Sequence, residues 1–273
     1  MSAVGRFESA LSPWRVVRFD EIDSTNEEAR RRALAADAGR LWIVAEKQSA
    51  GRGRRGRSWV SPKGNVYASA LLIEPCRAEI APQLGFVAGL ALARAAEDLG
   101  AARARLKWPN DLMSGNAKCA GLLVEGVTLS DRRLACIVGI GANCRRAPEG
   151  VAHPTAILTD CFGRPADPRD LFERLAARFD EALNQWRAGE AFETILLAWL
   201  DRAAGLGHPI RIEDRRGRRE GLFAGLDAAG RLLFRGKGGI EAIEAADLWI
   251  LRAPEGPTLP ASSPSLVREG PPR

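Results

Sequence analysis

The sequence predicts an α+β fold in two parts, because the pattern of its elements changes near residue 205. Before that point, apolar runs of strand length alternate with longer segments whose apolar residues recur at helical spacing. From Gly207 to Arg252, five short runs separated by glycine turns predict a small β-barrel. The chain has 273 residues and is 46% hydrophobic, which is enough apolar material for a core in each part.

The same change of pattern sets the expected domain limits. We expect a larger domain over residues 1–204 and the barrel over residues 205–252. The final segment, residues 253–273, is rich in proline, serine and glycine. Such a composition offers too little apolar surface to pack, so we expect a disordered tail there.

Four helices and five strands are expected in the larger domain. Ser24 and Glu27 have capping-box spacing at the first helix, and Gly100 follows the second, where glycine is typical. The expected helices cover residues 23–36, 82–99, 168–187 and 191–203. The expected strands cover residues 41–46, 66–73, 105–108, 118–126 and 133–139, and those of the barrel cover 209–213, 220–226, 231–234, 239–243 and 248–251.

Composition and charge narrow the class of protein. The formal net charge of +6 suits a polyanionic partner, but it suits equally a basic surface that aids solubility. The chain has five cysteines without a C-x-x-C pair and only two histidines, so it shows no zinc-binding pattern. The odd number of irregularly spaced cysteines suits a reducing compartment. We find no signal peptide, and the longest apolar stretch, residues 84–93, is too short to span a bilayer. We therefore expect a soluble, cytoplasmic protein with no membrane partner.

The most informative segment is residues 51–59, the Arg/Gly loop, whose first seven residues contain four arginines and three glycines. It has almost no apolar surface of its own, yet it stands between two expected strands. Glycine lets backbone N–H groups approach a ligand, and guanidinium groups pair well with phosphate or carboxylate oxygens. The segment therefore predicts a cationic loop that closes over an anion.

Four further segments stand in order with this loop: residues 21–26 (EIDSTN), 107–111 (KWPND), 118–125 (KCAGLLVE) and 139–143 (GIGAN). Together the five segments resemble those of biotin–protein ligases. The resemblance covers residues 15–145 by motif and the C-terminal barrel by pattern, where residues 221–227 resemble the family's SH3-like domain. The sequence has no G-x-x-x-x-G-K-[ST] segment, so ATP binding here would not be of the P-loop type.

This resemblance implies a fold and a reaction. The fold is a catalytic domain related to class II aminoacyl-tRNA synthetases, followed by an SH3-like β-barrel. In the reaction, the carboxylate of biotin attacks the α-phosphorus of MgATP, and a lysine amine of a biotin carboxyl carrier domain then attacks the biotinyl-5′-AMP. ATP, biotin and Mg²⁺ are therefore the expected ligands. The Mg²⁺ would come with the ATP phosphates, and we assign it no protein ligand.

By the same resemblance, Lys118, Arg54 and Asp111 are the expected catalytic residues. Lys118 bridges the biotin carboxylate and the α-phosphate, while Arg52 and Arg54 contact these groups from the loop. Asp111 orients the incoming lysine and takes up its proton, since a free lysine has a pKa of about 10.4. On local evidence alone, Lys118 could equally be a charge at a strand start, and Asp111 could form an Asx turn after Pro109.

The resemblance also assigns residues to each substrate. The expected biotin-binding residues are Ser24, Thr25, Gln48, Gly51, Arg52, Arg54, Lys118, Gly121 and Gly139. The expected nucleotide-binding residues are Arg54, Trp59, Asn110, Lys118 and Asn143. Two of them have simple structural alternatives, because Ser24 fits a helix cap and Trp59 fits a core residue at a strand start.

Two other functions stay open at this point. A lipoate–protein ligase has a related fold and also forms an acyl-adenylate, although the Arg/Gly loop and residues 107–111 favour biotin. A nucleic-acid-binding protein would use the arginines, but the chain has one tyrosine and no cluster of stacking aromatics. Only about twenty residues precede Ser24, too few for the helix-turn-helix of the family's repressors, so we expect no operator DNA binding. A homodimer is compatible with the sequence.

Overall fold

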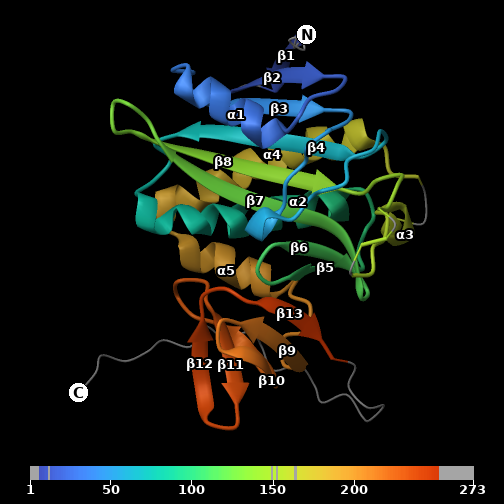
Figure 1. Ribbon diagram of the computed structural model, residues 1–273, viewed down its shortest axis with the longest axis vertical. Helices are drawn as coiled ribbons and strands as arrows, with labels where there is room; N and C mark the ends of the chain where they lie inside the picture. The colour runs from blue at the N-terminus through green and yellow to red at the C-terminus, as the bar shows by residue number, and fades with distance from the viewer. Residues whose placement is uncertain (1–5, 12, 149, 152, 163–164, 252–273) are drawn as a thin grey trace.

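The structure of the protein, a computed structural model, describes residues 6–11, 13–148, 150–151, 153–162 and 165–251. It is a mixed α+β fold with two sheets, and the smaller sheet lies at the end of the molecule opposite the N-terminal hairpin (Figure 1). The predicted α+β class is therefore confirmed. The expected tail, residues 253–273, lies outside the described residues.

The larger sheet has eight strands in the order β1-β2-β3-β4-β8-β7-β6-β5, and only β2 and β3 run parallel among its neighbouring pairs. The strands are β1 (Arg6–Leu11), β2 (Trp14–Phe19), β3 (Leu41–Ala45), β4 (Val66–Ile73), β5 (Ala104–Lys107), β6 (Asp111–Ser114), β7 (Ala117–Thr128) and β8 (Leu134–Ala142). The sequence did not predict β1, β2 or β6. Asp111, for which an Asx turn was one interpretation, begins β6, where it pairs with Lys107 of β5 and Gly121 of β7.

Helices cover both faces of the larger sheet (Figure 1). Alternate residues of a strand point to opposite faces, so Val17 and Ile43 join one apolar cluster and Val16 and Trp42 the other. Helix α1 packs in the first cluster, whereas α2, α4 and α5 pack in the second. The helices are α1 (Thr25–Leu34), α2 (Leu84–Asp98), α3 (Thr159–Phe162), α4 (Pro168–Trp186) and α5 (Phe192–Leu200), with 3-10 turns at Arg54–Gly56, Ala78–Gln83 and Arg187–Gly189. The four predicted helices are confirmed, and α3 was not predicted.

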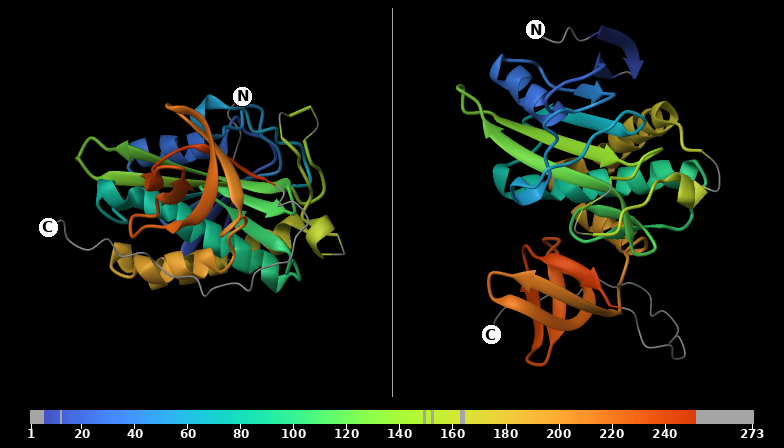
Figure 2. Two further views of the ribbon diagram at one scale, coloured as in Figure 1. Left: turned by 90° about the horizontal axis from the view of Figure 1, so that it is seen from below. Right: turned by 45° about the vertical axis from the view of Figure 1, so that its right-hand side comes forward.

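The smaller sheet contains the five strands predicted for the C-terminal part, in the order β12-β11-β10-β9-β13. They are β9 (Pro209–Asp214), β10 (Gly217–Leu226), β11 (Leu232–Gly236), β12 (Gly239–Ile243) and β13 (Asp247–Ile250). Within the described residues, the edge strands β12 and β13 are not hydrogen-bonded neighbours, so the strand ladder does not close. Figure 2 shows this twisted sheet beyond α5.

The two sheets share one apolar core. A single cluster of buried side chains extends from Trp42 through Trp199 to Phe223 of the smaller sheet. At the junction, Trp108 Nε1 donates to the carbonyl oxygen of Gly230 at 3.1 Å. The smaller sheet therefore packs directly against the segment that contains the KWPND residues. No helix in the described part of the chain is long and apolar enough to cross a membrane.

Candidate active site

A pocket of about 230 Å³ opens between the larger sheet, the Arg/Gly loop and β13. All five segments singled out in the sequence contribute to its wall. The predicted site residues that line it are Ser24, Thr25, Gln48, Arg52, Arg54, Trp59, Asn110, Asp111, Lys118, Gly121 and Gly139. Residues from distant parts of the chain therefore meet at one place.

One end of the pocket presents neutral polar groups at the start of α1. Ser24 caps the helix, its Oγ accepting from the backbone N of Glu27 at 3.4 Å. Thr25 donates to Gln48 Oε1 from its backbone N at 2.8 Å and from its Oγ1 at 3.1 Å. Ser69 Oγ lies 2.8 Å from Thr25 Oγ1. This end can therefore hydrogen-bond an uncharged ligand such as an amide or a urea.

Asn26, which was not among the predicted site residues, lies beside Gly139 on the pocket floor. Its side chain is buried, with Nδ2 donating to Glu125 Oε2 at 2.6 Å and Oδ1 accepting from Ser69 Oγ at 2.5 Å. A Cβ atom on Gly139 would lie 2.2 Å from Asn26 Oδ1. The absence of a side chain at Gly139 therefore leaves room for the protein's own Asn26.

The other end of the pocket is cationic, with one carboxylate between two ammonium groups. Asp111 Oδ1 lies 2.6 Å from Lys118 Nζ, and Asp111 Oδ2 lies 3.6 Å from Lys107 Nζ. All three side chains are less than 20% exposed. Burial lowers the pKa of Lys107, and the opposing charge of Asp111 does not fully offset this shift. An anion entering here would meet positive charge that water screens only weakly.

The Arg/Gly loop reaches over this cationic end. Arg54 Nη1 donates to Asn110 Oδ1 at 3.0 Å. Arg52 pairs with Glu27 at 3.0 Å and with Glu125 at 3.3 Å. The tip of the loop, Arg54–Gly56, is a single 3-10 turn without a buried residue. Polar contacts, rather than apolar packing, therefore hold the tip.

Trp59 packs on two glycines of the sheet and on Lys118, whose Nζ lies 5.2 Å from the centre of the indole ring. A Cβ atom on Gly141 would lie 2.5 Å from Trp59 Nε1, and one on Gly121 would lie 3.0 Å from both the ring and Lys118 Nζ. The buried Trp59 Nε1 has no hydrogen-bond partner among the described residues. Because such a group is costly to leave unpaired, it is a natural partner for a ligand acceptor.

The sequence and the fold are both similar to those of known proteins. The model of the biotin/lipoate A/B protein ligase family matches residues 18–143. The biotin–[acetyl-CoA-carboxylase] ligase of Paracoccus denitrificans is 39% identical over 242 residues, which are 83% of this chain and 97% of that protein. The chain belongs to the biotin–protein ligase family.

Two further relatives of the biotin–protein ligase family extend the comparison. The bifunctional ligase/repressor BirA of Escherichia coli is 33% identical over 220 residues, which are 80% of this chain and 68% of that protein. The structure of the biotin protein ligase from Aquifex aeolicus in complex with biotin and ATP has a TM-score of 0.75 and 29% identity, covering 86% of this chain and 99% of that chain. The structural similarity therefore extends well beyond residues 18–143.

Two residues that the resemblance to biotin–protein ligases assigned to the site do not line the pocket. Gly51 is the first residue of the Arg/Gly loop, and a Cβ atom there would be 2.4 Å from the carbonyl oxygen of Trp59, the last residue. It allows the two ends of the loop to approach closely. Asn143 is 1% exposed, and its Nδ2 donates to the carbonyl oxygen of Ala156 at 3.2 Å. These contacts, of Gly51 with Trp59 and of Asn143 with Ala156, lie outside the pocket lining. The ligand contacts of Gly51 and Asn143 therefore stay predictions.

Other residues line the pocket without having been predicted, among them Lys107, His153 and Asp247. Lys107 stands inside the KWPND segment, so the motif itself could have indicated it. His153 and Asp247 stand in no motif, and only the fold brings them here. Burial and the charge of Lys118 lower the pKa of His153. In the described part of the chain, no three His, Cys, Asp or Glu side chains gather as a metal site.

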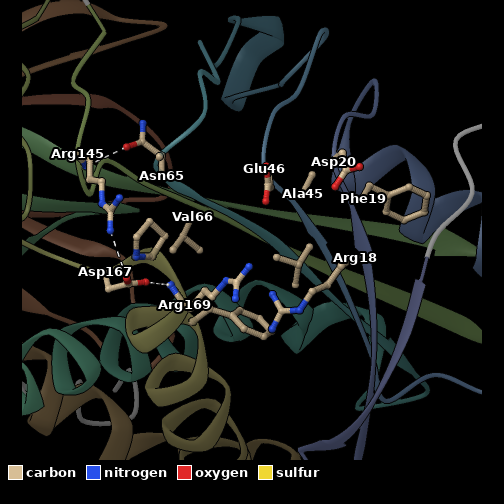
Figure 3. A pocket seen from close by; sticks show the side chains of 14 residues that line it. Arg18, Phe19, Asp20, Ala45, Glu46, Asn65, Val66, Arg145, Asp167 and Arg169 are labelled. Atoms are coloured by element: carbon tan, nitrogen blue, oxygen red, sulfur yellow. Dashed lines mark hydrogen bonds and ion pairs between the residues drawn. The ribbon is translucent and has the colours of Figure 1, made fainter.

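A second hollow, of about 480 Å³, contains none of the predicted site residues. It lies between the larger sheet and the start of α4, and Figure 3 shows its lining. Arg145 pairs there with Asp167 at 3.2 Å, and the Arg18 guanidinium lies 5.0 Å from the centre of the Phe172 ring. Asp20 and Glu46 line the same hollow, so its arginines are balanced by carboxylates. We therefore place the chemistry in the smaller pocket.

Proposed function

We propose that this chain is an ATP-dependent biotin–protein ligase, which forms biotinyl-5′-AMP and transfers the biotin to a lysine of a biotin carboxyl carrier domain. The observation that carries the proposal is the composition of one pocket. Neutral hydrogen-bonding groups around Thr25 stand at one end, and Lys118, Lys107 and Arg54 stand at the other. A ligand with a polar ring and a carboxylate that must meet a triphosphate fits this polarity. The names of the relatives support the same assignment.

In the first step, a carboxylate oxygen of biotin would bond to the α-phosphorus of ATP while the bond to pyrophosphate breaks. Two anions must approach each other, so the main demand on the protein is positive charge held in place. We assign this demand to Lys118, which is 16% exposed, and to Arg54 of the loop. Mg²⁺ on the phosphates would neutralise further charge, but the described residues offer no cluster to hold it, so we route no step through a protein-bound metal.

In the second step, the neutral amine of a carrier lysine would attack the carbonyl carbon of the anhydride, and AMP would leave. The amine must lose a proton, for which Asp111 is the proposed acceptor. Its carboxylate lies 2.6 Å from the Lys118 ammonium, so it stands beside the group proposed to hold the anhydride. The same carboxylate would thus serve both to orient Lys118 and to receive the proton.

For the two substrates, we propose that Ser24, Thr25, Gln48 and the floor glycines Gly121 and Gly139 contact biotin. Trp59 and Asn110 would contact the nucleotide. Arg52, held by Glu27 and Glu125, would add charge from the loop once a ligand competes for it. Gly51 would act by shaping the loop, and Asn143 by fixing the segment around Ala156.

We further propose that residues 1–204 form the catalytic domain of the class II synthetase type and residues 205–252 the SH3-like domain. The eight-stranded and five-stranded sheets support this division.

Five unpaired thiols suit the reducing cytoplasm. We expect no operator DNA binding, although the Escherichia coli relative is named a repressor, and a gel shift tests this. Light scattering decides whether a homodimer forms.

The decisive experiment is ATP–pyrophosphate exchange with purified protein and Mg²⁺. We expect exchange that depends on biotin, followed by biotin transfer to a carrier domain and none to a carrier whose acceptor lysine is replaced by alanine. Exchange with lipoate or octanoate in place of biotin would instead indicate a lipoate–protein ligase. Absence of exchange, together with nucleic-acid affinity that falls steeply with salt concentration, would instead indicate a nucleic-acid-binding protein.

A further inference from the structure

One carboxylate of the smaller sheet holds two arginines of the Arg/Gly loop. Asp247, the first residue of β13, lies with Oδ2 3.1 Å from Arg55 Nη1 and with Oδ1 2.6 Å from Arg57 Nη2. Directly before them in sequence, Arg54 turns the other way and donates to Asn110. Of the three arginines in residues 54–57, two therefore face Asp247 and one faces the larger sheet.

The backbone of the loop has an unfavourable conformation that the surrounding contacts must stabilise. Arg55 has φ 58° and ψ 33°, a left-handed conformation that costs free energy in a residue with a Cβ atom. Such a conformation persists where the surroundings fix it. The tip has no buried residue, so apolar packing does not supply the restraint. Backbone hydrogen bonds from Gly53 N to the Arg57 oxygen at 2.7 Å and from Arg57 N to the Arg54 oxygen at 3.3 Å close the turn. The contacts to Asp247 and Asn110 join this turn to the rest of the fold.

The charge of Asp247 is well suited to this task. Burial alone would raise the pKa of its carboxyl group, but the hydrogen bond from Arg57 and the charges of Arg57, Arg55 and Arg54 outweigh burial, and the pKa lies below its ordinary value. The carboxylate is thus ionised at neutral pH. It also reduces the repulsion among closely spaced guanidinium groups.

We propose that Asp247 is a positioning residue: by clamping Arg55 and Arg57 it holds the Arg/Gly loop over the pocket, so that Arg54 faces the anion. The smaller sheet would then contribute to the site through one side chain, without any need for that side chain to touch a substrate. The link to nucleotide binding rests on the proposed function, whereas the clamp itself does not.

Glu241 of β12 provides a matched control. Its carboxylate also bridges two arginines, Arg216 and Arg219, and its side chain is 32% exposed, compared with 33% for Asp247. It lies in the same sheet but does not line the pocket. Glu241→Gln therefore removes a similar pair of interactions from the same part of the fold and leaves the loop alone.

The clamp is tested by limited trypsin digestion of the ligand-free protein, with cleavage after Arg55 and Arg57 followed by mass spectrometry. We expect Asp247→Asn to raise cleavage at these two positions about three- to tenfold, as loss of two partly exposed ion pairs allows. Glu241→Gln should leave it unchanged, and Asp247→Glu should retain most of the protection. Exchanging the charges, with Asp247→Arg and Arg57→Asp together, removes the trypsin site at position 57, so cleavage after Arg55 is the readout for this protein. That cleavage should return towards the parent level if the ion pair is responsible.

A kinetic measurement tests the link to the site. In biotin-dependent pyrophosphate exchange, Asp247→Asn should raise KM for ATP several-fold and change kcat by less than about twofold, because the loop closes less often but in the same geometry. Equal cleavage after Arg55 in the parent, Asp247→Asn and the charge-exchanged protein would overturn the clamp. So would an equal effect of Glu241→Gln. A parent without exchange would refute the proposed function, while the digestion would still decide the clamp.

Discussion

The Lys118 ammonium is held in a way that keeps its charge ready for a ligand. It contacts Asp111 at 2.6 Å and lies 5.2 Å from the centre of the Trp59 ring, yet it is still 16% exposed to the pocket. An entering anion can therefore reach it without displacing a buried side chain. At such a site, the position of a single charge matters more than the net charge of the molecule.

Lys118→Ala should lower the rate of adenylate formation about a hundred- to a thousandfold, the usual loss when one preorganised charge is removed from a reacting centre. The fold should be preserved, because the side chain supports no core contact. Single-turnover formation of biotinyl-AMP is the measurement. Lys63→Ala, which breaks an ion pair with Glu46 at 3.2 Å on the surface, is the control. A near-normal first step in Lys118→Ala would remove this residue from the mechanism.

Asp111→Asn should slow transfer to the carrier domain about a hundredfold, because an amide cannot accept the proton of the incoming amine. The first step should fall less, since Lys118 and Lys107 remain and are no longer paired with a carboxylate. Transfer from preformed biotinyl-AMP separates the two effects. Asp98→Asn, which disturbs a surface pair with Arg178, should leave transfer unchanged. Equal transfer by Asp111→Asn and the parent would make Asp111 purely structural.

At the scale of elements, we expect a bound ligand to alter the conformation of the Arg/Gly loop. Side-chain contacts of Arg52, Arg54, Arg55 and Arg57 tie it to the rest of the fold, and a phosphate or carboxylate can replace each of them. We expect it to become less mobile when the adenylate binds. Closure would shield the reactive anhydride from water until the carrier arrives.

Arg54→Gly should weaken the closed state and let biotinyl-AMP escape, so that lysines of unrelated proteins become biotinylated. The loop should still fold, because in the described part of the chain the one side-chain hydrogen bond of Arg54 is that to Asn110. The variant is incubated with ATP, biotin and an unrelated protein, which is then probed for biotin. Arg40→Gly removes a guanidinium that pairs with Asp180 elsewhere and should label nothing. Normal adenylate formation with unchanged retention would show that this arginine does not close the site.

Element positions were predictable where one periodic signal dominated. Val66–Ile73 was predicted to the residue because its eight residues are almost continuously apolar. Strand β2 was missed because Val16 and Val17 are both buried, one on each face of the sheet, which removes the alternation. Strand β6 has four residues after Pro109, where turn signals outweigh strand signals.

The site was predictable only as far as the motifs extend. Lys118, Asp111 and Thr25 line one pocket, and each could be singled out because it stands in a segment with a recognisable pattern. Their ligand contacts stay predictions. Asp247 could not be found in this way. Its strand pairs with β9, and its contact to Arg57 spans 190 positions of sequence, so only the packing of the second sheet reveals it.

For the molecule as a whole, the two sheets do not behave as independent bodies in their packing. Buried residues of the smaller sheet, such as Phe223 and Leu248, belong to the same apolar cluster as Trp199 of α5. The boundary near residue 205 is thus a change of sequence pattern rather than a break in the core. Unfolding one sheet would expose apolar surface on the other, which couples their stabilities.

We therefore expect one calorimetric unfolding transition, with equal calorimetric and van't Hoff enthalpies. Gly230→Ala should lower the midpoint temperature of this transition without splitting it in two. The reason is that Gly230 has φ +81° and a Cβ atom there would lie 2.7 Å from the Phe86 ring. Gly207 has φ +76° with open space around it, so Gly207→Ala carries the same backbone cost of about 1 kcal/mol without the collision. Gly230→Ala should therefore lose about 1–3 kcal/mol more of its free energy of unfolding than Gly207→Ala, and this difference measures how much the packing between the two sheets contributes to stability. Because Gly230 accepts the hydrogen bond from Trp108, next to Lys107, activity should fall in this variant alone. Two separate transitions in the parent, or equal losses in both variants, would mean that the sheets are stable independently and that the junction does not support the site.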